Sequence, residues 1–230
     1  VTLKSNGIFN SEQAFSVMGI GPQDNIFSID AAELEQRLKK CPAIRRASVK
    51  RQISSNPTLL VDIDARIPVA WIDCPELGIH PGDATYGALA DKEGVIFPCM
   101  EQVHMPYIQE KRMPSVTLRP PSSGKLSYGV SIRELEAPMK LIELLSGTVT
   151  EYLPSIVSIT TPNDWSFCVR FTNDCQATFS HYGLEHQVEK LSRALRHARQ
   201  THRKISSINL IPEHNIPVIF DDSYEDIPLA

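Results

Sequence analysis

The sequence has no apolar run close to the roughly 20 residues that a membrane-spanning helix requires. It also has no GxGxxG turn, no Walker-type phosphate loop and no GxSxG motif, so nothing indicates a dinucleotide-binding fold, an NTPase or a serine hydrolase. Basic residues are not in excess, because 23 Lys and Arg stand against 27 Asp and Glu. They cluster at 45–51 and 190–204, but no aromatic residues interleave there for base stacking, and we expect no nucleic-acid partner.

Cysteine is scarce, and its arrangement excludes two common uses. The five cysteines are odd in number and contain no CxxC pair, which argues against a structural zinc site and against a disulfide scaffold. We expect most of them to be small apolar core residues. Cys168 and Cys175 flank a predicted hairpin but do not fall at opposed positions, so no disulfide is expected between them.

No set of residues converges on a catalytic or metal site. His181 and His186 are five residues apart, as are His197 and His202, whereas two ligands on one helix face need a spacing of three or four. The acidic stretch 221–226 lacks the glycine turn and the terminal glutamate of a calcium loop. We therefore expect no catalytic residue, no metal and no cofactor, and a protein that is not an enzyme.

The first 67 residues follow the order strand, helix, helix, strand, strand. A strand is expected within residues 1–9, a helix starting at Ser11, and a second helix from the N-cap Asp30, with Glu33 completing a capping box, to the stop at Pro42. Polar and apolar residues alternate through 45–66 on either side of an Asn-Pro turn, and this pattern predicts a hairpin. Its apolar face consists of Ala47, Val49, Ile53, Leu59, Val61, Ile63 and Ala65.

The rest of the chain is rich in strands. We expect loops at 73–88 and 113–129, a hairpin around 91–94, a helix at 138–146, strands at 156–160, 165–171 and 175–179, an amphipathic helix at 184–198, and final strands at 205–212 and 216–220. Alternation in the strand at 165–171 places Trp165, Phe167, Val169 and Phe171 on one face.

These patterns predict an α+β protein with a small β-α-α-β-β domain at 1–67. A larger mixed or antiparallel β domain with flanking helices follows at 68–220, and an acidic tail at 221–230. The two domains, joined in series at 66–71, are expected to share little core and to form an elongated monomer.

The stretch from Asn25 to Trp71 resembles the POTRA domain of the bacterial cell-division family FtsQ/DivIB. Matching positions in this stretch are Pro42, Ile44, Ala47, Val49, Arg51, Pro57, Thr58, Leu59, Ile63, Arg66, Pro68, Val69 and Ala70, and further on Asp91, Gly94 and Phe97. The sequence departs from the family pattern at Ala65, where a glutamate is usual, in a longer 73–88 loop, and at Pro217 in the last strand.

The resemblance implies a non-enzymatic divisome scaffold, the periplasmic part of a single-pass inner-membrane protein at the division septum. Its membrane helix would lie outside this chain. It would bind FtsB/FtsL-like bitopic proteins by β-strand addition at the distal β domain, while the POTRA domain helps to recruit it. The alternative is a POTRA-containing outer-membrane assembly or secretion factor that binds polypeptides.

We expect the partner-binding residues on the last two strands, at Ile205, Ile208, Leu210, Ile216, Val218, Ile219 and Phe220. Pro217 has no N–H to donate. A ladder with a partner therefore requires that its nitrogen face away from the incoming strand or that the partner bulge there.

Overall fold

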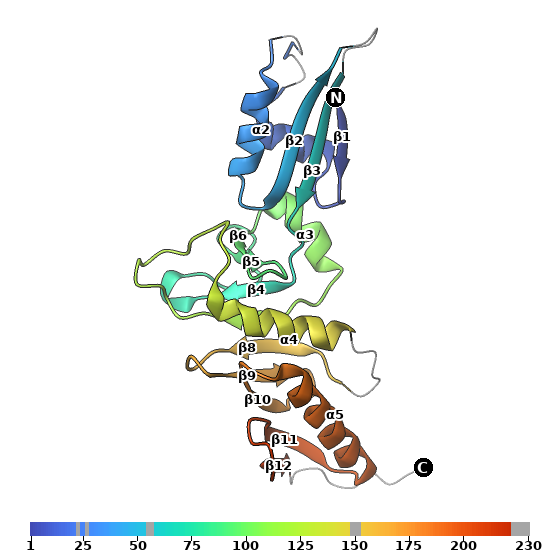
Figure 1. Ribbon diagram of the computed structural model, residues 1–230, viewed down its shortest axis with the longest axis vertical. Helices are drawn as coiled ribbons and strands as arrows, with labels where there is room; N and C mark the ends of the chain where they lie inside the picture. The colour runs from blue at the N-terminus through green and yellow to red at the C-terminus, as the bar shows by residue number, and fades with distance from the viewer. Residues whose placement is uncertain (22–23, 26–27, 54–57, 148–152, 222–230) are drawn as a thin grey trace.

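The computed structural model describes residues 1–21, 24–25, 28–53, 58–147 and 153–221. They form two β-sheets placed one after the other along the long axis of an elongated molecule, with β1 towards one end and β12 towards the other (Figure 1). We call residues 1–65 the N-terminal unit and residues 70–221 the distal unit. The fold is α+β, as predicted.

The N-terminal unit has the predicted order of elements, namely β1 (Thr2–Ser5), α1 (Ser11–Met18), α2 (Ala31–Lys40), β2 (Ile44–Gln52) and β3 (Thr58–Ala65). The three strands lie in the order β1-β3-β2, with β1 parallel and β2 antiparallel to β3. Both helices contribute to the core beneath the sheet, as expected for strands with one apolar face. The predicted inward residues of β3, which are Leu59, Val61, Ile63 and Ala65, are all buried.

Helix α1 begins at Ser11 as predicted, but two other local predictions for this unit were wrong. The N-cap of α1 is Asn10, since its side chain accepts from the Gln13 N–H at 2.9 Å and Gln13 accepts in return from the Asn10 N–H at 2.8 Å. Asp30 caps α2 as predicted, but Glu33 pairs with an arginine one turn later instead of completing a capping box. Ile53 lies beyond the end of β2 and is 80% exposed.

The distal unit contains a nine-stranded mixed sheet. Its strands are β4 (Ala70–Asp73), β5 (Ala88–Ala90), β6 (Ile96–Pro98), β7 (Ser115–Thr117), β8 (Ile156–Thr160), β9 (Ser166–Phe171), β10 (Gln176–Ser180), β11 (Lys204–Asn209) and β12 (Val218–Asp221), in the spatial order β12-β11-β10-β9-β8-β7-β4-β5-β6. Its helices are α3 (Glu101–Gln109), α4 (Glu136–Gly147) and α5 (Leu184–Gln200), with short 3-10 turns at Pro75–Leu77 and Arg133–Leu135.

Helices α4 and α5 contact each other and cover one face of the distal part of this sheet (Figure 1). The inward residues of α5 and of β9 to β11 form the larger of two apolar cores. The hairpin predicted around 91–94 is confirmed, because β5 and β6 pair antiparallel on either side of that turn. Parallel pairs join β4 to β7, β7 to β8, and β10 to β11.

Other predictions for the distal unit need correction. The segment 113–129, expected as loop, contains β7, a three-residue strand between β4 and β8. Trp165 precedes β9 and is 60% exposed, so only Phe167, Val169 and Phe171 of the predicted apolar face point into the core. Asp221 belongs to β12 rather than to the acidic tail, and the rest of that predicted tail lies outside the described residues.

Helix α3 was not predicted, since Pro106 in its interior disrupts the helical pattern. A proline at this position cannot donate to the carbonyl of Gln102, one turn earlier. That carbonyl instead accepts a hydrogen bond from the side chain of Gln13 in α1, at 2.5 Å. The helix therefore depends on a contact from a residue far away in the sequence.

The expectation of little shared core between the two units was also wrong. The core of the N-terminal unit continues into the distal unit, where it includes Trp71, Leu89, Phe97, Cys99, Val103 and Ile108. Apart from Cys99, which directly follows β6, these residues come from β4 to β6 and from α3, which lies against the end of the three-stranded sheet (Figure 1). The two sheets are separate, but a single apolar cluster spans the junction between them.

Candidate partner-binding edge

A partner strand can add only to a sheet edge whose outward N–H and C=O groups are unoccupied. In the structure the edge strands are β1 and β2 in the N-terminal unit, and β6 and β12 in the distal unit. The four edges differ in whether neighbouring residues already cover them, and this determines whether a partner strand can pair with them.

The β2 edge is occupied by a side chain of its own domain. Glu35 of α2 accepts a hydrogen bond from the Val49 N–H at 3.1 Å, and Lys39 holds the same carboxylate at 2.5 Å. The Lys39 hydrogen bond, followed by the Val49 N–H, lowers the pKa of Glu35. Arg51, further along β2, donates to the carbonyl of Ile29. Helix α2 thus already occupies the Val49 N–H, one of the backbone groups that a partner strand would need, and the Arg51 side chain ties the loop before α2 to this strand.

The β6 edge is also covered. The Gly129 N–H donates to the carbonyl of Ile96 at 2.7 Å, and the Ile96 N–H donates to the carbonyl of Val130 at 3.4 Å. Val95 and Ser131 form an antiparallel bridge beside them. The remaining edge of the N-terminal unit, β1, is four residues long, the same length as β12.

Strand β12 ends the sheet at the distal tip, and no other strand among the described residues pairs with its outer side. On its inner side the Asn209 N–H donates to the carbonyl of Pro217 at 3.0 Å, which makes these two residues a hydrogen-bonded pair. The N–H and C=O of one residue in an extended strand point to the same side. The nitrogen of Pro217 therefore faces β11, away from an incoming strand.

The pairing register fixes which groups of β12 face outward. Val218 lies opposite Ile208 and Ile219 lies opposite Ser207. Because hydrogen-bonded and non-bonded pairs alternate, Ile219 bonds inward, like Pro217, and the N–H and C=O of Val218 point outward. Phe220, two residues further on, repeats the outward orientation. Two successive outward positions form the minimal template for an added strand.

The side chains of the seven expected partner-binding residues divide into two groups. Ile205, Ile208 and Leu210 are 2%, 2% and 0% exposed, so they are core residues that support β12 from behind rather than surface residues. Ile216, Val218 and Phe220 are partly buried against the same core, whereas Ile219 is 63% exposed on the opposite face. The candidate surface is therefore narrower than the sequence predicts, and it consists of residues 216–220.

Two basic residues at the start of β11, which the sequence does not single out, hold β12 in place: Arg203 directly precedes the strand and Lys204 is its first residue. The guanidinium of Arg203 lies 3.5 Å from the centre of the Phe220 ring. Lys204 pairs with Asp221 at 3.7 Å. A cation over an aromatic face and an ion pair at the strand end both stabilise this edge in the position that the ladder requires.

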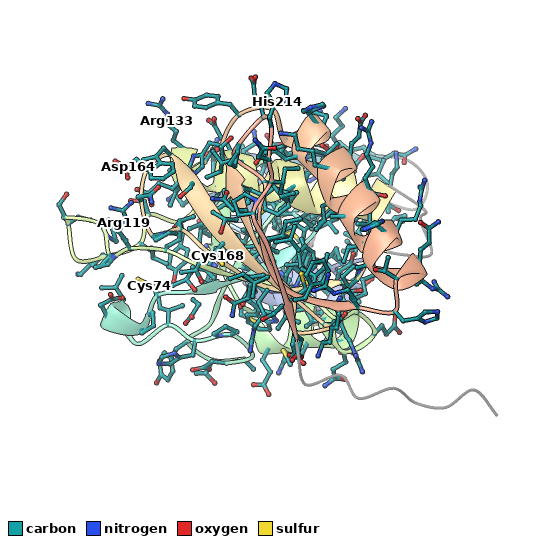
Figure 2. All side chains as sticks on the ribbon, turned by 90° about the horizontal axis from the view of Figure 1, so that it is seen from below. Cys74, Arg119, Arg133, Asp164, Cys168 and His214 are labelled. Atoms are coloured by element: carbon teal, nitrogen blue, oxygen red, sulfur yellow. The ribbon has the colours of Figure 1, made fainter. Side chains whose placement is uncertain are left out.

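A cleft of about 590 Å³ opens where β8, β10, α4 and α5 meet. Its charged lining residues are Arg119, Arg133, Lys140, Glu134, Glu136 and Asp164. Figure 2 shows Arg119, Asp164 and Arg133 on the same side of the molecule, and Arg119 pairs with Asp164 at 2.6 Å. His181 also lines this cleft. Within the described part of the chain, no three His, Cys, Asp or Glu side chains gather to hold a metal ion.

All five cysteine thiols are free, and burial raises the pKa of each of them, to about 11 for Cys99 and Cys175. Cys168 lies opposite Thr178 in the hairpin, whereas Cys175 precedes β10. This register confirms that Cys168 and Cys175 are not opposed. None of the described helices is long and apolar enough to cross a bilayer.

Comparison with known families finds a match for one part of the chain. Residues 1–64 match the family model described as POTRA domain, FtsQ-type. No curated protein matches the sequence. The matched residues coincide with the β-α-α-β-β unit described above, and the match supports the resemblance to FtsQ/DivIB. The N-terminal unit of this chain is therefore similar to FtsQ-type POTRA domains.

Proposed function

We propose that this chain is the extracytoplasmic part of an FtsQ/DivIB-like division scaffold that binds an FtsB/FtsL-like partner by adding a partner strand to β12. The POTRA match supports the family assignment, and the geometry of β12 supports the binding mode. The observation that carries the proposal is the inward orientation of Pro217, since its missing N–H then falls on the side that β11 already occupies.

The β2 and β6 edges are poorer templates. A strand adding to β2 would have to displace Glu35 from the Val49 N–H, and one adding to β6 would have to displace residues 129–131. A secretion or assembly factor that bound polypeptides at its POTRA edge would meet the first of these obstacles. Strand addition at β12 displaces no described strand.

The arrangement of the two ends of the molecule supports the scaffold role. The POTRA domain lies at one end of the elongated molecule and β12 lies at the other (Figure 1). A membrane anchor preceding the POTRA domain would place that domain near the bilayer and β12 further into the periplasm. Division proteins bound at the two ends would then be linked by a non-enzymatic spacer.

The experiment compares two substitutions at one position. Val218→Pro removes the outward N–H without removing a donor from the ladder with β11, while Val218→Ala truncates the same side chain and keeps the N–H. Binding of the extracytoplasmic segment of the organism's own FtsB-like protein would be measured by calorimetry. We expect V218P to unfold within about 2 °C of V218A and to bind at least about tenfold more weakly.

A third variant serves as a control for this comparison. Ile219→Pro removes an N–H that bonds inward, so its thermal unfolding should fall clearly below that of both Val218 variants. If V218P and V218A are equally stable and bind the partner equally well, strand addition at β12 is wrong.

A further inference from the structure

Arg66, the residue directly after the N-terminal unit, forms a buried ion pair with Asp91 of the distal unit. The guanidinium of Arg66 lies 2.5 Å from the Asp91 carboxylate, and the two side chains are only 13% and 3% exposed. Arg66 follows β3 of the POTRA domain, and Asp91 begins the β5–β6 turn of the distal unit. Most ion pairs of this chain have partners that are far more exposed.

Both partners are tied into their own units. The Arg66 N–H donates to the Ala43 carbonyl at 2.8 Å, and its Nε donates to the Pro42 carbonyl at 3.1 Å. The second carboxylate oxygen of Asp91 accepts from the backbone N–H groups of Glu93 and Val95, at 3.0 and 2.9 Å. Neither charge can follow the other if the units move apart, because each is held by the backbone on its own side.

Two more contacts cross the junction at other places. Gln13 of α1 donates to the carbonyl of Gln102 in α3, and Arg45 pairs with Glu93 at 3.2 Å. Between these polar contacts lies the apolar cluster that both units share. Rotation of one unit against the other would expose that cluster and leave two buried charges unpaired, and both consequences are strongly unfavourable.

We infer that the POTRA domain and the distal unit form one rigid body, and that the Arg66–Asp91 pair fixes their relative orientation. The chain then unfolds as a single cooperative unit, and a ligand at either end leaves the angle between the units unchanged. The chain is then a rigid spacer that holds its two ends at a constant distance and direction, rather than two modules joined by a hinge. This inference rests on the junction alone and not on the partner proposed for β12.

Residual dipolar couplings measured by NMR on the whole chain test this inference, with calorimetry alongside. For the wild type we expect one alignment tensor to fit the amides of both units, and one unfolding transition. Arg66→Met removes the guanidinium, and Asp91→Asn removes the charge but keeps the oxygen that caps the turn. Each variant should need two different tensors, and its POTRA transition should separate and shift to lower temperature.

Arg119→Met is the matched control, because Arg119 forms an exposed pair with Asp164, away from the junction. This variant should keep one tensor and one transition. Two tensors in the wild type would overturn the inference, and so would one tensor in both junction variants. If Arg66→Met and Asp91→Asn instead lose the dispersed POTRA spectrum altogether, the pair maintains the fold rather than the orientation, which also contradicts the proposed role.

Discussion

The N–H of Asn209 donates to the carbonyl of Pro217 at 3.0 Å, and this bond turns the proline nitrogen towards β11. In the sequence, Pro217 is the residue that most threatens strand addition at the end of the chain. In the structure, its missing donor falls on the inner side of β12, which pairs with β11. The outward groups belong to Val218 and Phe220, which both have an N–H.

A charge at Ile219 should weaken partner binding without unfolding the protein. Ile219 is 63% exposed, so an Ile219→Asp variant buries no charge and should unfold within about 2 °C of the wild type. The carboxylate would be desolvated by an added strand, so we expect a several-fold loss of affinity for the FtsB-like segment. Thr160→Asp, at an exposed position on β8, is the control and should bind normally. Equal affinities for both variants would contradict the assignment.

The carboxylate of Glu35 should titrate below its ordinary pKa of 4.5, because Lys39 and the Val49 N–H both stabilise its charged form. A folded-state pKa below the unfolded value means that this contribution to stability is present above about 4.5 and is lost as the pH falls through the folded value. NMR titration of the Glu35 side chain measures the midpoint directly. In Lys39→Met the midpoint should rise towards 4.5; an unchanged midpoint would exclude Lys39 as the main cause.

His104 should make the stability of the chain sensitive to moderate acid. Burial lowers its pKa to about 4, and its neutral Nδ1 accepts a hydrogen bond from the Met100 N–H at 2.9 Å. The folded-state pKa lies below the ordinary value of 6.5, so the associated stability is complete above about 6.5 and decreases as the pH falls towards 4. Protonation would remove the acceptor and place a charge in the shared core.

Thermal unfolding followed from pH 6.5 to 4 tests the role of His104. A His104→Gln variant keeps a possible acceptor but does not titrate, so it should be less stable than the wild type at neutral pH and should lose less stability on acidification. Parallel pH profiles for the two proteins would show that another group is responsible.

The five cysteines should differ in reactivity. Cys41 and Cys168 are half-buried, whereas Cys74, Cys99 and Cys175 are buried. A thiol reacts as its thiolate, so burial and a raised pKa both slow its alkylation. Timed alkylation of the native chain, followed by peptide mapping, should modify Cys41 and Cys168 first. Early modification of Cys99 or Cys175, or an intact mass that indicates a disulfide, would contradict the structure.

The sequence predicts the elements whose signals are local. Alternation from Leu59 to Ala65, the N-cap at Asp30 and the turn around Gly94 each depend on a few neighbouring residues, and the structure contains all three. Helix α3 could not be predicted in this way, because the carbonyl that Pro106 leaves free is satisfied by Gln13. The three-residue strand β7 is likewise too short for its periodicity to be read, and its neighbours in the sheet define it.

The candidate site, too, could be predicted from the sequence only where its signals are local. Apolar alternation identifies the last two strands but does not distinguish a residue that faces a partner from one that faces the core. Ile205, Ile208 and Leu210 are therefore expected among the partner-binding residues, although the structure buries them. The orientation of Pro217 depends on its register with β11, and the occupation of the β2 edge depends on Glu35 from a different element. Neither of these long-range relationships has a sequence signal.

Amide hydrogen exchange at β12, measured by NMR with and without the FtsB-like segment, tests strand addition most directly. In the free protein we expect the Ile219 amide to be protected by its bond to β11, and the Val218 and Phe220 amides to exchange quickly. On binding, the Val218 and Phe220 amides should become protected while Ile219 changes little. If the segment binds and both amides continue to exchange at their free rates, the partner does not add a strand to β12.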